Sequence, residues 1–154
     1  MTNLCCDVIC RLQGKQLVTA ESLTGGGIGA SLTAVSGSSA VYKGGVISYT
    51  NEVKHRVLGV PADMLEKYGA VSAPVAQAMA EGVRKLLEAD VSVSVTGLAG
   101  PGGDEYGNPV GTVFVAYCDT GITEVKQFLF SGDRESVRKQ TAVEALKLIL
   151  KNHA

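Results

Sequence analysis

Apolar positions recur every three or four residues over several stretches of the chain, which is the spacing of amphipathic helices. A proline in the first turn marks the start of one of these stretches, and Ser131 or Asp133 is suited to cap the last. Helices are therefore expected at residues 4–12, from Gly25 or Gly26 to about residue 35, on either side of Gly59-Val60-Pro61, at 74–88 and at 134–151.

Short apolar runs that end in polar or glycine residues predict strands between these helices. They lie at residues 16–20, 45–49, 91–95, 110–118 and 122–130. Because helices separate the early strands, those strands are expected to be parallel, whereas the last two, joined across Asp119-Thr120-Gly121, are expected to form an antiparallel hairpin. The pattern predicts an α/β domain with a mixed, mostly parallel sheet, and we expect residues 1–154 to form this one domain.

Composition excludes several classes of protein. The 154 residues are 45% hydrophobic and 19% charged, which is enough apolar material for a core and excludes a disordered chain. A net charge of −1 provides no broad basic field, so we expect no nucleic-acid partner. The apolar runs are too short to cross a bilayer, and residues 1–11 contain no secretory signal pattern. We therefore expect a cytoplasmic protein with no membrane association.

Ligands of α/β sheets bind where polar loops follow the strand ends, and three loops qualify: residues 21–27, 49–54 and 96–103. In the first loop, a strand leads through Ser22 into three glycines that open a helix, a place suited to a phosphate or an oxyanion. The alternative is that Ser22 or Thr24 only caps the helix. Residues 25–30 also match the dinucleotide fingerprint G-x-G-x-x-A, but four residues separate the strand from the first glycine and no acidic residue ends the next strand.

Histidine-based chemistry has few candidates, because the only histidines are His55 and the penultimate His153. Neither has the spacing of a zinc site with the four cysteines, so we expect free thiols and no metal. A Ser–Lys catalytic pair is still possible, because Lys54 follows the second strand and a buried lysine can act as a base. Tyr49, five residues earlier, could relay the proton to Ser22. The alternatives are that Tyr49 is a strand-end aromatic residue and Lys54 a solvated helix residue.

Seven blocks of sequence resemble the C-terminal domain of the competence/damage-inducible protein CinA, whose stand-alone form is nicotinamide mononucleotide deamidase. The blocks occur in the family's order and span residues 4–150. They are Thr19-Ala20-Glu21-Ser22-Leu23-Thr24-Gly25-Gly26, Gly37-Ser38-Ser39, Tyr49-Thr50-Asn51-Glu52-Val53-Lys54, Gly69-Ala70-Val71-Ser72, Gly97-Leu98-Ala99-Gly100-Pro101, Pro109-Val110-Gly111-Thr112-Val113 and Gly132-Asp133-Arg134.

The resemblance implies a three-layer α/β/α sandwich and hydrolysis of the carboxamide of nicotinamide mononucleotide to nicotinate mononucleotide and ammonia. It implies Ser22, Tyr49 and Lys54 as the catalytic residues and a homo-oligomer as the assembly. This chemistry requires no cofactor or metal. We expect Lys54 to take the Ser22 proton directly or through Tyr49, and backbone N–H groups of the glycine-rich turn to hold the oxyanion.

Further residues are candidates for binding the substrate and its 5′-phosphate. Arg134 opens the last helix and Arg138 lies one turn further on the same face, although either could be a salt-bridged surface residue. The other candidates are Thr24, Gly25, Gly26, Asn51, Thr96, Gly97 and Gly100.

Two other functions compete with the deamidase. A non-catalytic nucleotide-binding or interaction module, linked to DNA uptake or the damage response, would keep the glycine turns but would not need Ser22, Tyr49 and Lys54 together. A nicotinamide-dependent oxidoreductase is suggested only by the G-x-G-x-x-A match. The joint presence of the three catalytic candidates favours the enzyme.

Overall fold

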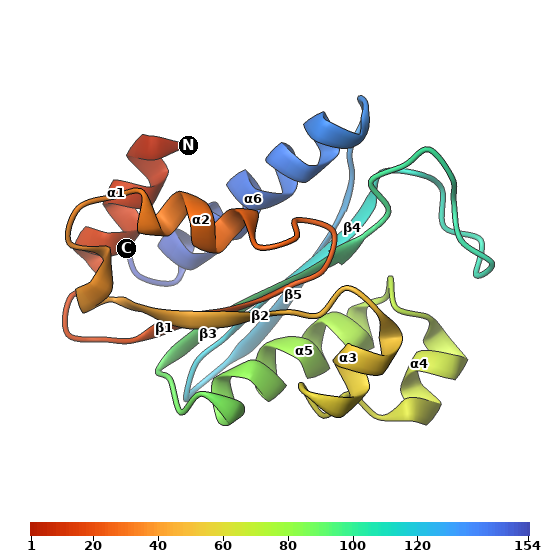
Figure 1. The fold of residues 1–154 in the computed structure, drawn as a ribbon, viewed down its shortest axis with the longest axis horizontal. Coiled ribbons are helices and arrows are strands. Elements are labelled where there is room, and N and C mark those ends of the chain that lie inside the picture. Colours follow the sequence, from red (N-terminus) through yellow and green to blue (C-terminus); the bar gives the residue numbers. More distant parts are fainter.

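A five-stranded sheet lies between two layers of helices in the computed structural model, which describes residues 1–154 (Figure 1). The strands follow the order β2-β1-β3-β4-β5 across the sheet. The pairs β2–β1 and β1–β3 are parallel, and β3–β4 and β4–β5 are antiparallel. The strands are β1 (Leu17–Glu21), β2 (Tyr42–Ile47), β3 (Val91–Gly97), β4 (Thr112–Cys118) and β5 (Thr123–Leu129). The predicted mixed sheet with a late hairpin is confirmed: parallel and antiparallel pairings are equal in number, and every strand except β4 runs in one direction.

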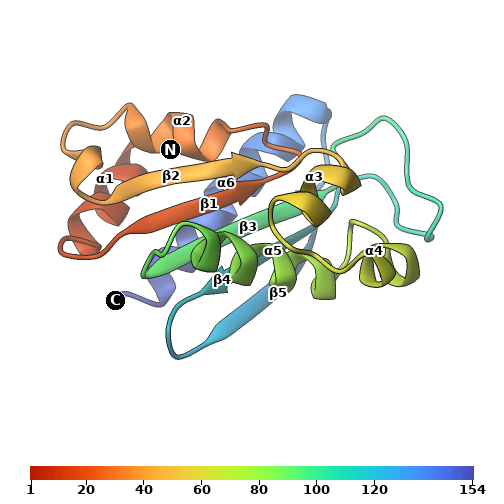
Figure 2. The ribbon, with the colours of Figure 1, turned by 60° about the horizontal axis from the view of Figure 1, so that its bottom comes forward.

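Six α-helices cover the two faces of the sheet (Figures 1 and 2). One face carries α1 (Thr2–Arg11), α2 (Gly27–Thr33) and α6 (Arg134–Lys151), and the other carries α3 (Asn51–Arg56), α4 (Ala62–Tyr68) and α5 (Ala73–Leu86). A short 3₁₀ helix spans Ser38–Ala40. The three-layer α/β/α architecture is therefore confirmed. None of the helices combines the length and the apolar character needed to cross a membrane.

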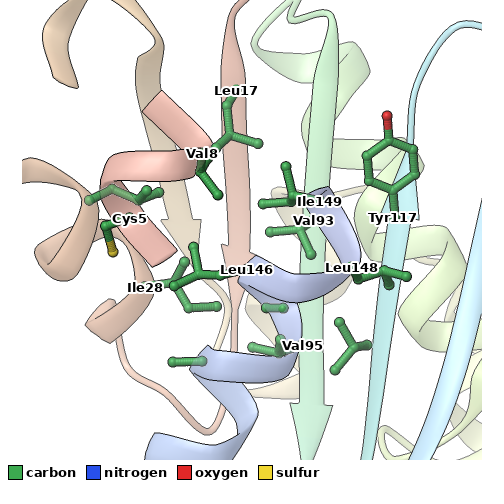
Figure 3. Close-up of a cluster of buried hydrophobic side chains, with 14 of the residues drawn as sticks. Cys5, Val8, Leu17, Ile28, Val93, Val95, Tyr117, Leu146, Leu148 and Ile149 are labelled. Atoms are coloured by element: carbon green, nitrogen blue, oxygen red, sulfur yellow. The ribbon is translucent and has the colours of Figure 1, made fainter. Parts of the chain in front are cut away.

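The larger apolar core fills the space between the sheet and the layer of α1, α2 and α6. It contains 22 buried residues, including Val8, Ile28, Val93 and Leu146 (Figure 3). The opposite face holds two smaller clusters, of nine and six buried residues, against α3, α4 and α5. Because helices cover both faces, every residue of β1 and β4 and all but the last residue of β3 are buried.

Hydroxyl side chains on β3 attach the sheet to α5. The valines of β3 enter the larger core, so the alternate residues face the other helix layer. There Ser92 and Ser94 each donate a hydrogen bond of 2.6 Å to an α5 carbonyl, those of Ala80 and Ala76. Thr96 continues the series by donating to the carbonyl of Ala70 at 2.8 Å. This last bond places residues 70–72, which lead into α5, beside the end of β3.

The strand predicted at residues 45–49 is wrong at both ends, because β2 begins at Tyr42 and ends at Ile47. The glycines at 44 and 45 interrupt the apolar pattern but lie inside the strand, where Gly45 is paired with Thr19 of β1. A Cβ at Gly45 would overlap the Thr19 hydroxyl group, which is hydrogen-bonded to the Tyr42 hydroxyl at 2.7 Å. The glycine provides space for this pair, and Tyr49 lies beyond the strand.

Candidate active site

The carboxyl ends of β2, β1 and β3 meet at one edge of the sheet, and a pocket of about 300 Å³ lies there. Ser22 directly follows β1, Lys54 lies on α3, the first helix after β2, and residues 97–100 of the segment that ends β3 also line the pocket. The ends of β1 and β3 and the start of α3 lie at the same edge of the sheet (Figure 2). Arg134, the first residue of α6, reaches the same pocket. The lining residues are Ser22, Leu23, Tyr49, Lys54, Ala70, Val71, Thr96, Gly97, Leu98, Ala99, Gly100, Gly102 and Arg134.

Lys54 is buried beside Ser22, with only 1% of its surface exposed. Its Nζ lies 3.0 Å from Ser22 Oγ. The same nitrogen donates to the main-chain carbonyls of Ser48 at 2.7 Å and Tyr49 at 3.2 Å. The position of Lys54 follows from the start of α3, where the Thr50 side chain accepts a hydrogen bond from the backbone N–H of Val53. Thr50 is thus the N-cap of α3 and lies four residues before Lys54.

Burial lowers the pKa of Lys54 from 10.5 to about 8, because removal from water disfavours the charged ammonium. A neutral lysine amine has two N–H groups and one lone pair. The carbonyls of Ser48 and Tyr49 can accept both N–H groups, which leaves the lone pair for the hydroxyl of Ser22. The arrangement therefore suits proton transfer from Ser22 to Lys54 near neutral pH.

The phenol of Tyr49 does not lie between Lys54 and Ser22. Tyr49 contacts Lys54 through its main-chain carbonyl, while its side chain is 59% exposed. The phenol oxygen accepts a hydrogen bond of 3.2 Å from Arg134 Nη2, and Arg134 Nη1 donates to the carbonyl of Gly100 at 2.6 Å. The geometry thus favours direct proton transfer over a relay, and it places Tyr49 and Arg134 together at the pocket.

The structure does not bring every predicted binding residue to the pocket. Thr96, Gly97 and Gly100 line it. Asn51 does not, because it is an exposed residue at the start of α3. Arg138 also lies outside the pocket: it donates to the carbonyls of Leu23 at 2.9 Å and Thr24 at 3.2 Å.

The turn of Thr24, Gly25 and Gly26 also lies outside the pocket lining. The start of α2, which follows this turn, is occupied by the carboxylate of Glu21. The Glu21 side chain is buried and accepts hydrogen bonds from the Thr24 hydroxyl at 2.7 Å and from the first amides of the helix, those of Ile28 at 2.8 Å and Gly29 at 3.0 Å. These amides are not available to a substrate phosphate. An acidic residue placed between a buried strand and a helix was the signal that could have indicated this role.

The apolar lining was missed by the sequence analysis. Ala70, Val71, Leu98 and Ala99 are among the residues that line the pocket, and no acidic side chain lines it. Ala70 and Val71 lie in the Gly69-Ala70-Val71-Ser72 block of the resemblance, and Leu98 and Ala99 lie in the Gly97-Leu98-Ala99-Gly100-Pro101 block, which were the available signals. The chain contains no group of three or more side chains that could hold a metal ion.

Comparison with known proteins identifies the family of the chain and agrees with its fold. The model of the family described as the CinA C-terminal domain matches residues 4–153. The chain belongs to the CinA C-terminal domain family. A CinA-like protein of Citrifermentans bemidjiense is 49% identical over 139 residues, which are 90% of this chain and 34% of that protein. A CinA-like protein of Parasynechococcus marenigrum is 52% identical over 136 residues, which are 86% of this chain and 32% of that protein.

The chain spans about a third of the length of these curated CinA-like relatives. Solved structures of the CinA superfamily match it over nearly their whole length. The competence or damage-inducible protein from Enterobacter asburiae has a TM-score of 0.97 at 34% identity, over 99% of this chain and 98% of that chain. Competence damage-inducible protein A from Klebsiella pneumoniae has a TM-score of 0.93 at 39% identity, over 97% of this chain and 94% of that chain.

Proposed function

We propose that the chain is an amidohydrolase in which Ser22 attacks a carboxamide carbon and Lys54 accepts the Ser22 proton. The observation that carries this proposal is the 3.0 Å contact between the Ser22 hydroxyl and a buried lysine amine whose pKa is lowered to about 8. An ordinary surface lysine is almost fully protonated at neutral pH and is a poor base. Burial supplies a neutral fraction large enough for catalysis.

The reaction takes place in two stages. Ser22 Oγ forms a bond to the carboxamide carbon while its proton moves to Lys54 Nζ. The C–N bond then breaks, and Lys54 returns the proton to the departing nitrogen, which leaves as ammonia. In the second stage water attacks the acyl carbon and gives a proton to Lys54. The C–Oγ bond breaks, Ser22 regains a proton from Lys54, and the carboxylic acid loses its proton to ammonia in solution.

We propose nicotinamide mononucleotide as the substrate, as the family resemblance implies. The apolar side chains of Ala70, Val71, Leu98 and Ala99 suit the flat pyridinium ring, and a pocket of about 300 Å³ suits a small ligand. Arg134 is the lining side chain that stays charged while Lys54 acts as a neutral base, and no acidic side chain lines the pocket. This balance favours an anionic substrate, and the exposed guanidinium of Arg134 is placed to bind a phosphate with two N–H groups.

The proposal is tested by incubating the chain with nicotinamide mononucleotide, nicotinamide riboside or nicotinamide and measuring ammonia. We expect ammonia from the mononucleotide in equal amount to nicotinate mononucleotide, and at least tenfold lower kcat/KM for the riboside, which lacks the phosphate. Calorimetric binding of the mononucleotide without ammonia release would instead indicate the non-catalytic nucleotide-binding module. Equal activity on the riboside would refute the role of the phosphate while leaving the amidohydrolase intact.

A further inference from the structure

Two backbone N–H groups directly after Ser22 have no partner in the chain. Leu23 and Thr24 are 4% and 3% exposed, yet neither amide donates a hydrogen bond. The N–H of Gly25 donates to the carbonyl of Ser22 and that of Gly27 to the carbonyl of Thr24, whereas Gly26, whose amide donates no hydrogen bond within the chain, is only part-buried. Unpaired amides of buried residues are rare, and a pair of them beside a nucleophile points to a ligand that accepts both hydrogen bonds.

Arg138 fixes the orientation of the peptide that contains one of these amides. Its Nε donates to the carbonyl of Leu23 at 2.9 Å and its Nη2 to the carbonyl of Thr24 at 3.2 Å. The Leu23–Thr24 peptide is trans and planar, so its N–H points away from the carbonyl and therefore away from Arg138. Ser22 and Leu23 line the catalytic pocket, whereas Thr24 and Arg138 line a separate surface depression.

We propose that Arg138 is a positioning residue that holds an oxyanion hole formed by the N–H groups of Leu23 and Thr24. The proposal rests on the amidohydrolase function, because these amides would stabilise the negative oxygen formed when Ser22 attacks the substrate carbonyl. The amide directly after a nucleophile has this role in other hydrolases. Arg138 does not touch the substrate. It prevents rotation of the turn, and its hydrogen bond to the Leu23 carbonyl makes the Thr24 amide, which belongs to the same peptide, a stronger donor.

Arginine suits this role better than lysine. Its planar guanidinium can donate to two neighbouring carbonyls at once, whereas a lysine amine is a single point donor. Arg138→Lys keeps the charge and the aliphatic stem but loses the second fixed donor. It therefore separates the geometry of the turn from the positive charge near Ser22.

The first test measures the rate at which a fluorophosphonate probe labels Ser22. In this reaction Oγ bonds to phosphorus, fluoride leaves, the Ser22 proton goes to Lys54, and the phosphoryl oxygen occupies the oxyanion hole. We expect Arg138→Ala to lower the rate about 10- to 100-fold and Arg138→Lys to lower it several-fold. The matched control is Lys139→Ala, an exposed neighbour on α6 whose only ion pair is with Glu135. Rates within twofold of wild type in both Arg138 variants would overturn the proposal.

The second test compares nicotinamide mononucleotide with its thiocarboxamide analogue, because sulfur accepts hydrogen bonds more weakly than oxygen. We expect Arg138→Ala to lower kcat about 10- to 100-fold for the carboxamide, to leave KM within about threefold, and to reduce the preference for oxygen over sulfur at least fivefold. An unchanged preference, or a rise in KM with normal kcat, would overturn the positioning role. Arg138→Lys decides the result if the alanine variant does not fold.

The two tests separate the possible failures. A wild-type chain that labels at Ser22 but releases no ammonia would refute the proposed substrate, and the labelling rates would still decide the role of Arg138. A wild-type chain that does not label at all would overturn the oxyanion hole together with the Ser22–Lys54 pair.

Discussion

Raising the pH from 7 to 9.5 is expected to increase kcat/KM for nicotinamide mononucleotide about tenfold, with a midpoint near pH 8. The cause is the titration of Lys54, which must be neutral to accept the Ser22 proton and whose pKa burial lowers to about 8. The substrate phosphate, with a pKa of about 6, is already doubly ionised over this range. The rise therefore reports the enzyme and not the substrate.

The magnitude follows from the lowered pKa. With a pKa of about 8, roughly 9% of the Lys54 side chains are neutral at pH 7 and almost all are neutral at pH 9.5. With the unperturbed value of 10.5, only about 0.03% would be neutral at pH 7. Burial thus increases the fraction of active base at pH 7 about 300-fold, which corresponds to about 3 kcal/mol.

Ammonia release at low substrate concentration, measured in overlapping buffers of constant ionic strength, gives the profile. A profile that changes less than twofold between pH 7 and pH 9 would refute the assignment of Lys54 as the base. A tenfold rise per pH unit that continues to pH 10 would refute the lowered pKa. Lys54→Arg serves as the control, because a guanidinium stays protonated throughout and should reduce kcat more than about 10³-fold at every pH.

The same lowered pKa affects stability with a defined sign. Between pH 8 and pH 10.5 the unfolded state binds more protons at Lys54 than the folded state, so the free energy of unfolding should rise with pH in this window. The contribution is about 3 kcal/mol. The difference between wild type and Lys54→Met in urea unfolding at pH 7 and pH 10.5 isolates it from other groups, and a difference that does not change with pH would contradict the burial argument.

Three substitutions test other parts of the structure. Arg134→Ala should raise KM for the mononucleotide at least tenfold with kcat within about threefold, since a charge-assisted hydrogen bond to phosphate contributes about 1.5–3 kcal/mol. An unchanged KM in steady-state kinetics would exclude Arg134 from substrate binding. Glu21→Gln should lower the free energy of unfolding by about 2 kcal/mol or more, because an amide N–H₂ then faces donors in the turn; a loss below about 0.5 kcal/mol in urea would contradict this account. Gly82→Ala should destabilise by about 1–3 kcal/mol, although alanine usually stabilises a helix interior, because its Cβ would overlap the carbonyl oxygen of Leu58; a more stable variant in the same assay would be the opposite result.

Periodicity was sufficient for the elements whose packing repeats regularly. The last helix spans Arg134–Lys151 as predicted, because an apolar stripe and a capping side chain agree, and of the two predicted caps, Ser131 and Asp133, Asp133 is the one observed. The hairpin was predicted for the same reason. The limits of β2 were not predicted, because Gly45 lies inside the strand to make room for the Thr19 and Tyr42 hydroxyl groups, and local pattern carries no information about such a tertiary contact.

The candidate site was likewise predictable only in part from the sequence. Ser22 and Lys54 follow parallel strands, so topology alone brings their loops to one edge of the sheet, and their contact of 3.0 Å could be anticipated as a hypothesis. The use of each amide in the glycine-rich turn could not be anticipated. It depends on how Glu21 and Arg138 approach the turn from different elements, and neither approach leaves a sequence signal of its own.

The central claim is that the Ser22 hydroxyl, activated by Lys54, is the group that attacks the carboxamide. The most direct test measures ammonia release from nicotinamide mononucleotide by wild type and by Ser22→Ala. The unfolding temperatures of the two proteins are measured as well, to show that the variant is folded. We predict turnover by wild type and a loss of more than about 10³-fold in the variant, because no other nucleophile lies beside the lysine amine. Turnover by a folded Ser22→Ala chain within tenfold of wild type would contradict the claim.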